Sequence, residues 1–303
     1  MKRVLQVLAA ASAAVLFAAG AMAQTLYAVS VRTYSDPGYK GVEGNLYTVD
    51  PDNAATQLVT SLNVGKTPIG MEGLAIHPRT GVFYGITSAT AATIPHSLVI
   101  VDPLTGNVTP VGDLGDAGSD ISFDADGTLY VWLANSRQIA TVDLDTGRAT
   151  ARGRPIERGA AKGAFAIIGS GKAYLAATGG AGTVDTVDIQ TGMITTGPTL
   201  TGAPFPDLIT GLAYSPHGVL FGINTNFGRS TQANLVTIDP ATGKVTNVGA
   251  LPNDTDAITF GPATQQKDLF SNIMEWRLPV LVLLFLFAMG VLFFTMRPKK
   301  SGE

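Results

Sequence analysis

The sequence contains no cysteine, so disulfide bonds and thiolate metal sites are both excluded. It holds only three histidines, and it lacks the H-E-x-x-H zinc motif, the G-x-S-x-G nucleophile elbow, the P-loop and the dinucleotide fingerprint. No nucleophile and base can be paired with conviction from the residues that remain. These absences favour a protein that is not an enzyme, without excluding catalysis.

Positive charge is scarce in the central part of the chain. Between Gln24 and Phe270, 21 Asp and Glu outnumber 14 Lys and Arg. Proteins that bind nucleic acids usually present a basic surface, so no nucleic-acid partner is expected. This region also lacks a sustained helical periodicity, so helices are not expected to build its core.

Residues 1–23 have the pattern of a secretory signal peptide. Lys2 and Arg3 precede a mostly apolar run from Val4 to Ala19, and the small residues of Ala21-Met22-Ala23 follow. Signal peptidases cut after such a site, so we expect cleavage after Ala23. An uncleaved N-terminal anchor is the alternative.

Residues 278–296 predict a transmembrane helix, because they carry no charge and are long enough to cross the hydrocarbon core. Three basic residues lie in the tail 297–303, and positive charge favours the cytoplasmic side of a span. We therefore expect a single-pass protein of the bacterial inner membrane, with a linker over 264–277. Its C-terminus is expected in the cytoplasm and its main domain in the periplasm or outside. A sorting signal removed during maturation is the alternative for this segment.

One short sequence recurs five times between the two ends. Residues 98–115 read LVIVDPLTGNVTPVGDLG and residues 235–252 read LVTIDPATGKVTNVGALP, identical at eleven of eighteen positions. Related segments begin at Leu46, Ile139 and Val184. Self-similarity at intervals of 41 to 52 residues indicates a repeat architecture.

The D-P-x-T-G run within each copy predicts a turn rather than a binding site. An Asp side chain accepts hydrogen bonds from nearby backbone N–H groups, and glycine adopts the left-handed conformation easily. The first copy has Asn53-Ala54 in place of this glycine, so its turn can differ. The predicted turn residues are Asp50, Asp102, Asp143, Asp188, Asp239, Gly106, Gly147, Gly192 and Gly243.

A second pattern precedes each later copy and consists of two short apolar runs separated by a turn with glycine. GLAIHPRTGVFYGI, which begins at Gly73, is one example. Runs of this length that are rich in Val, Ile, Tyr and Phe predict strands, so each unit has four. Four antiparallel strands repeated at this spacing predict the blade of a β-propeller.

The two ends of the repeat region predict how the ring closes. DAITFGP, from Asp256, supplies a first strand without a second, and TLYAVS, from Thr25, supplies a second strand without a first. Pairing them completes a blade and removes two exposed strand edges. The sequence therefore predicts an all-β, five-bladed β-propeller over residues 24–263. An open stack or a pair of β-sandwiches is the alternative.

GLAIHPRTGVFYGIT followed by LVIVDPLTGNVTPVG resembles the repeat of secreted bacterial β-propeller proteins, the broad group with WD-like, NHL-like and lactonase-like members. The resemblance covers Gln24 to about Pro262, and the WD dipeptide itself is absent. It implies blade architecture. Because this group contains both enzymes and binding scaffolds, it does not imply one activity.

The residues that precede each inner strand are expected to surround one mouth of the central channel. Glu72, Asp120 and Asp256 are carboxylates in these positions, and three carboxylates could hold a hard cation such as Ca²⁺. Lys162 lies in the corresponding part of another repeat and could neutralise them instead. A solvated mouth without a cofactor is therefore the preferred prediction, and a Ca²⁺ site is the alternative.

Loops between the second and third strands open onto the same face, where binding function is expected. The predicted function is a membrane-anchored, extracytoplasmic binding or protein-interaction module for a protein or carbohydrate of the cell envelope. The alternative is a metal-dependent hydrolase of the lactonase-like type, in which the resemblance implies an added Asn ligand. The candidate residues of this face are Tyr34, Tyr39, Phe205, Phe227, Asn135 and Asn224.

Overall fold

A computed structural model describes residues 24–31, 44–91, 93–156, 162–178, 182–206, 208–226 and 232–261. These residues belong to one compact unit that extends from Gln24 to Pro262. Within them, no helix has the length and apolar character needed to cross a membrane. The predicted signal peptide, linker, membrane span and tail lie outside the described residues, as do Tyr34, Tyr39 and Phe227.

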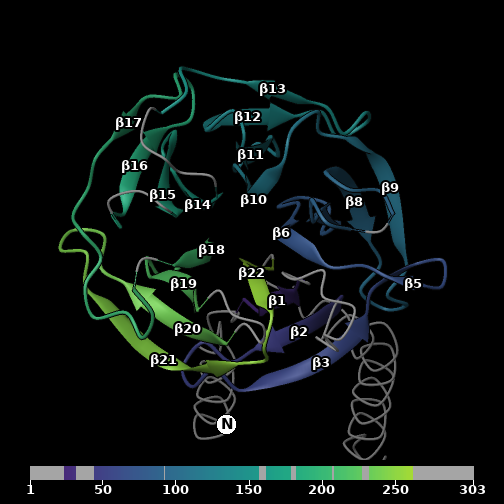
Figure 1. The fold of residues 1–303 in the computed structure, drawn as a ribbon, viewed down its shortest axis with the longest axis horizontal. Coiled ribbons are helices and arrows are strands. Elements are labelled where there is room, and N and C mark those ends of the chain that lie inside the picture. Colours follow the sequence, from purple (N-terminus) through teal and green to yellow (C-terminus); the bar gives the residue numbers. More distant parts are fainter. Residues whose placement is uncertain are drawn as a thin grey trace, which may run out of the picture. The chain divides into compact units, whose positions relative to one another are not determined.

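Five four-stranded antiparallel sheets follow one another around a ring, which confirms the predicted five-bladed β-propeller (Figure 1). In each of the blades below, the first strand lies nearest the axis and the fourth strand lies at the rim. A short hairpin of β4 (Asn63–Val64) and β5 (Thr67–Pro68) lies between the first two blades in the chain. The blades comprise, in order, β22 (Thr255–Phe260), β1 (Leu26–Ser30), β2 (Asn45–Val49) and β3 (Thr56–Ser61); β6 (Met71–Ile76), β7 (Phe83–Thr87), β8 (Ser97–Val101) and β9 (Val108–Asp113); β10 (Gly118–Phe123), β11 (Leu129–Leu133), β12 (Gln138–Val142) and β13 (Ala149–Ala151); β14 (Lys162–Gly169), β15 (Lys172–Thr178), β16 (Asp185–Asp188) and β17 (Ile194–Thr195); β18 (Ile209–Tyr214), β19 (Leu220–Thr225), β20 (Ala233–Ile238) and β21 (Val245–Leu251).

The ring closes by pairing the last described strand with the first. β22 and β1 are antiparallel, with Leu26 opposite Phe260 and Val29 opposite Ala257. The predicted pairing of the two terminal strands is therefore confirmed. The five inner strands also pack side by side around the axis, with β22 between β18 and β6. Closure in this way leaves no blade without a neighbour on either side.

The hydrophobic core is divided into five clusters, one in each gap between consecutive blades. Side chains alternate along a strand, so each blade contributes one face to the gap before it and one to the gap after it. Trp132 of β11 and Phe165 of β14, for example, share the gap between the third and fourth blades and are both fully buried. Each blade therefore depends on its neighbours for most of its buried surface.

The repeated aspartates form the predicted turns between the third and fourth strands. Asp102 accepts hydrogen bonds from the N–H of Leu104 (2.9 Å) and the hydroxyl of Thr105 (2.6 Å), and Gly106 has a φ of 75°. The same kinds of bond, led by the Thr105 hydroxyl at Asp102, hold the pKa values of four of the five repeat aspartates below their ordinary range. These aspartate side chains are therefore engaged in hydrogen bonds within their own turns.

The first turn has the same backbone hydrogen bonds as the other turns, although the sequence allowed it to differ. Ala54 takes the place of the glycine with a φ of 60°, and its N–H donates to the carbonyl of Asp50, as the glycine N–H does in the other copies. Asn53 supports it by accepting a bond from the N–H of Ala55. The backbone hydrogen bonds of the turn are thus strong enough to hold an alanine in the left-handed region, which costs about 1–2 kcal/mol.

The turn glycines have a second role, because each of these turns packs against backbone in or just after the rim strand of the preceding blade. A Cβ at Gly106 would lie 2.1 Å from the carbonyl oxygen of Ser61, and one at Gly147 would lie 2.5 Å from that of Gly112. The carbonyl of Gly106 also accepts a hydrogen bond from Asn63. The repeated motif therefore joins consecutive blades at the rim, and this contact leaves no space for a side chain.

This contact predicts unequal costs for two glycine substitutions that share one backbone conformation. Gly81 and Gly147 have φ values of 72° and 75°, but a Cβ at Gly81 would meet nothing within 4 Å. We expect Gly81→Ala to lower the free energy of unfolding by about 1–2 kcal/mol, the cost of the left-handed conformation alone. Gly147→Ala should cost at least twice as much, measured by denaturant unfolding. Equal losses would mean that the turn glycine does not hold the blades together.

Candidate functional site

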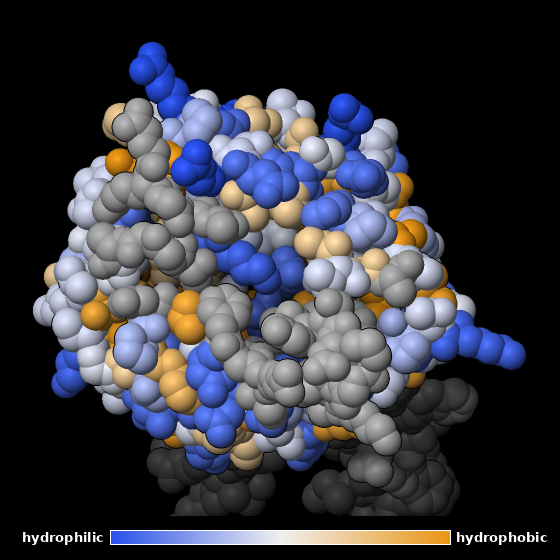
Figure 2. Space-filling view, in the orientation of Figure 1, coloured by the Kyte–Doolittle hydropathy of each residue, from blue (hydrophilic) through white to orange (hydrophobic). Residues whose placement is uncertain are grey.

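One mouth of the channel is surrounded by residues at the start of the inner strands. Four of these strands begin with a β-bulge, whose extra residue is Glu72, Ser119, Thr210 or Asp256. Lys162 begins the fifth inner strand, β14. We call these five residues the mouth cluster. In Figure 2 the centre of the ring is hollowed, and hydrophilic residues gather in it.

An ion pair crosses the mouth cluster between the second and fourth blades. The ammonium of Lys162 lies 3.0 Å from Oε1 of Glu72, which also accepts a hydrogen bond from the hydroxyl of Ser88 at 3.0 Å. Burial lowers the pKa of Lys162, but Asp256 and Glu72 together outweigh burial and raise the pKa above its ordinary value. Lys162 therefore remains charged and neutralises Glu72, as the sequence indicated it could.

Asp120 lies fully buried beside the axis and joins three blades. Its Oδ1 accepts the N–H of Ile121 at 2.9 Å. Its Oδ2 accepts the N–H of Phe165 in β14 at 2.9 Å and that of Leu212 in β18 at 3.1 Å. Burial raises the pKa of Asp120 well above its ordinary range, and the three N–H donors act in the opposite direction. Both oxygens are thus engaged by the backbone of the protein itself.

Asp120 occupies a position at which every other inner strand has a small residue. Without a partner, the N–H groups on the edge of an inner strand would face the channel unsatisfied, which is costly away from water. Ser122, two residues further along β10, also accepts an N–H group of β14, because its hydroxyl accepts the N–H of Ile167 at 3.1 Å. The residues equivalent to Asp120 by register are Gly73, Ala164, Gly211 and Ala257.

Asp256 is the mouth-cluster carboxylate in the bulge of β22. It is buried, and its pKa is raised to about 7, chiefly by burial and in smaller part by Glu72 and Asp254. Lys162 acts in the opposite direction. The hydroxyl of Thr210 donates to the backbone carbonyl of Asp256 at 3.2 Å, which fixes the position of the bulge. Asp256 therefore changes charge near neutral pH.

The three predicted metal ligands do not share one ligand set. Among the described residues, no group of three or more His, Asp or Glu is arranged to hold a metal ion. Asp120 is engaged by three backbone N–H groups and Glu72 by Lys162. The geometry therefore counts against the Ca²⁺ site at Glu72, Asp120 and Asp256, which stays a prediction.

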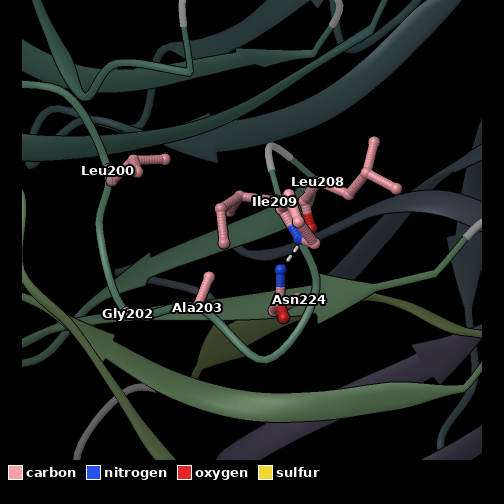
Figure 3. A pocket seen from close by; sticks show the side chains of 7 residues that line it. Leu200, Gly202, Ala203, Leu208, Ile209 and Asn224 are labelled. Atoms are coloured by element: carbon pink, nitrogen blue, oxygen red, sulfur yellow. Dashed lines mark hydrogen bonds between the residues drawn. The ribbon is translucent and has the colours of Figure 1, made fainter.

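Asn224 holds a loop in place through both ends of its side-chain amide. It is fully buried, its Oδ1 accepts the N–H of Phe205 at 2.8 Å, and its Nδ2 donates to the carbonyl of Phe205. Its Nδ2 also donates to the carbonyl of Leu208 (Figure 3). Asn135 is exposed, and its backbone N–H donates to Asp116 at 3.3 Å. Neither asparagine belongs to the mouth cluster, and an asparagine ligand to a metal stays a prediction.

A small pocket of about 160 Å³ lies beside the mouth cluster under the loop that Asn224 holds. Ile209, which lines it, directly precedes Thr210. Sequence reasoning missed this pocket because its walls come from a loop and two strands that meet only in the folded blade. The remaining lining residues, most of them apolar, are Leu200, Gly202, Ala203, Pro206, Leu208 and Asn224 (Figure 3).

Comparisons with known proteins bear on the fold. No family model matches the chain, and no curated protein matches its sequence. A chain from the crystal structure of a nidogen/laminin complex is similar, with 10% identity, a TM-score of 0.51, and coverage of 80% of this chain and 99% of that one. A protein of unknown function from Bacteroides caccae gives 13% identity, a TM-score of 0.49, and coverage of 79% and 99%. The first likeness supports a β-propeller fold and nothing narrower, so the resemblance to secreted bacterial propellers stays a prediction.

The raised pKa of Asp256 predicts a pH dependence of stability with a defined sign. Between the unfolded value near 4 and about 7, the folded state binds more protons, so stability falls as the pH rises through this window. We expect Asp256→Asn to remove part of this fall, up to about 1.4 kcal/mol per pH unit. Urea unfolding between pH 5 and 7.5 measures it. Asp52→Asn, which removes an exposed carboxylate, is the control and should keep the wild-type slope.

If the wild type and Asp256→Asn show parallel stability curves across this pH range, Asp256 does not change its protonation there.

Proposed function

We propose that this protein is a binding module that acts outside the cytoplasm and presents the mouth face of its propeller to a ligand. The observation that carries the proposal is the use of the mouth carboxylates. Asp120 is engaged by backbone N–H groups of three strands, and Glu72 is paired with Lys162. Groups engaged in this way hold the blades together and are not available as nucleophile, base or metal ligand.

The mouth face has the features of a binding surface on a rigid scaffold. The mouth cluster is polar and recessed, and a partly apolar pocket lies beside it. Polar groups next to an apolar pocket are typical of ligand sites. The blades below are fixed by five core clusters, so the loops of this face stand on a firm base.

We further propose that the ligand is a protein or carbohydrate of the cell envelope and that the segment 278–296 holds the propeller to the membrane. The uncharged segment, the basic residues after it and the signal-peptide pattern of residues 1–23 support this placement. The similar chain from the nidogen/laminin complex is compatible with protein binding by this fold. That likeness is one of fold alone.

No group of residues that the structure describes supports the alternative of a metal-dependent hydrolase. A metal of this type needs several oxygen ligands with free lone pairs. Among the residues that the structure describes, no such group is present, and Asn224 is held by its loop.

Cysteine labelling tests the proposed function, because the chain has no cysteine of its own. Ala89 is exposed next to Ser88 on the mouth face, and Asp126 is exposed in the turn at the opposite end of β10. In intact cells a membrane-impermeant maleimide should label Ala89→Cys and Asp126→Cys, but Ser301→Cys only after permeabilisation. Ala89→Cys should also react several-fold more slowly in cells than when purified, because a ligand covers the mouth face.

Asp126→Cys is the matched control and should react at the same rate in both settings. Labelling of Ser301→Cys in intact cells would overturn the proposed orientation. Equal rates for Ala89→Cys in cells and in purified protein would overturn ligand binding at the mouth face.

A further inference from the structure

Large apolar side chains are exposed at the junction between the rims of the first two blades. Leu58 and Val59 of β3 are 59% and 39% exposed, and Leu104, in the turn between β8 and β9, is 91% exposed. That turn packs against the end of β3, since a Cβ at Gly106 would lie 2.1 Å from the carbonyl oxygen of Ser61. The three apolar side chains therefore come from segments that meet, and we call them the rim patch.

The rim patch arises because β3 differs from the other rim strands. Val59 is the extra residue of a β-bulge, since Leu46 pairs with Thr60 and Tyr47 pairs with Leu58. A bulge interrupts the alternation of side chains along a strand, so Leu58 and Val59 are both exposed although they are neighbours. None of the equivalent residues in three other rim strands is a large aliphatic residue. By register, these equivalents of Leu58 are Pro110, Ala151 and Asn247.

The sequence of β3 also lacks the residues by which a sheet edge usually avoids pairing with another chain. Charged side chains, proline and short length are the common means of protection. No charged residue and no proline occurs between Asn53 and Gly65. In contrast, β9 contains Pro110, and β13 is only 3 residues long. The rim of the first blade is therefore an edge at which another chain can associate.

Charges of opposite sign flank the rim patch at the two ends of β3. Before the strand, Asp50 and Asp52 are exposed in the first turn. After the strand, the hairpin of β4 and β5 extends outward from the ring and carries the exposed Lys66 at its tip (Figure 1). When two β3 strands lie antiparallel, the acidic end of each meets the basic end of the other, and the apolar residues meet at the centre. This surface is thus complementary to a second copy of itself.

The direction of β3 determines how two associated copies would face. Figure 1 shows that β3 runs along the circumference of the ring. Two such strands become antiparallel when one ring is turned by half a turn about an axis parallel to its own and placed beside the other. This rotation leaves the mouths of both rings on the same side. Association through β3 therefore keeps both mouth clusters accessible from one direction.

We propose that the rim patch is the interface of a symmetric dimer, in which the β3 strands of two copies pack antiparallel about a two-fold axis. Leu58 and Val59 form the centre of this interface, and Lys66 of each copy lies against Asp52 of the other. An apolar centre within a polar border is the usual composition of a protein interface. The inference goes beyond the proposed function, because it concerns the rim rather than the mouth face and gives the binding module two mouths.

Cross-linking of the purified full chain tests the interface, because the chain has no cysteine of its own. Val59→Cys and Val219→Cys are matched variants, since both valines are 39% exposed, but Val219 lies in the turn between β18 and β19. A short bis-maleimide should join Val59→Cys chains into dimers at least tenfold faster than Val219→Cys chains. Each rate is divided by the rate of labelling with a mono-maleimide, which corrects for the reactivity of the thiol. Adding Leu58→Asp places like charges at the centre and should abolish the difference.

Exchanged charges test whether the occupant of the rim patch is a second copy. Lys66→Asp and Asp52→Lys, each introduced into Val59→Cys, make the charges that meet across the interface alike. Each variant alone should therefore cross-link several-fold more slowly than Val59→Cys. In an equal mixture, a Lys66→Asp chain meets an Asp52→Lys chain with opposite charges at both ends of β3. Most of the cross-linking rate should then return, which a change of fold in either variant would not produce.

Equal corrected rates for Val59→Cys and Val219→Cys would overturn the dimer. An unchanged rate after Leu58→Asp would also overturn it, because association would then come from another part of the chain. If the mixture is as slow as each charge variant alone, the charges do not meet across two copies and the proposed arrangement is wrong. Protection of Val59→Cys from the mono-maleimide without any cross-linking would show that another segment or another molecule covers the patch, which likewise contradicts the proposal.

Discussion

The carboxylate of Asp120 meets the main structural problem of a narrow propeller, which is the convergence of five open strand edges at the axis. Each inner strand has N–H groups that no neighbouring strand in its own blade can accept. Asp120 accepts such groups from Phe165 and Leu212, so one side chain of the third blade holds the fourth and fifth. The equivalent positions of the other four blades hold Gly or Ala, whose side chains cannot accept a hydrogen bond. Of these five residues, only Asp120 can therefore bond to the N–H groups of the inner strands. The mouth above it can then be polar without exposing the core.

The rim and the axis are stabilised by different means. At the rim, the repeated turns bring glycine backbone against the preceding blade, as Gly147 does against Gly112. At the axis, the contacts are polar and are not repeated from blade to blade. The repeated part of the sequence therefore builds the ring, and the residues that break the repeat give the mouth its chemistry. Glu72, Lys162 and Asp256 are all of this second kind.

This division explains what could be predicted from the sequence. The blade count, the D-P-x-T-G turns and the pairing of β22 with β1 were predictable because each follows from a local pattern or from an incomplete repeat. The role of Asp120 was not, because Phe165 and Leu212 lie 45 and 92 residues away in the chain. Aligning the five repeats would have given one signal, since Asp120 alone is charged where the others are small. The contacts of Asn224 were not predictable for the same reason, because the loop residues that it holds lie 16 to 19 residues away in the chain.

Amide hydrogen exchange tests most directly whether Asp120 holds the axis together. Exchange is measured at Phe165, Leu212 and Ile167 in the wild type and in Asp120→Ala, a change that gives β10 the residue found at Ala164 and Ala257. The account predicts that Phe165 and Leu212 lose protection in the variant, while Ile167, whose N–H donates to Ser122, keeps it. Unchanged protection of Phe165 and Leu212 would contradict the account and would show that the carboxylate does not hold these strands.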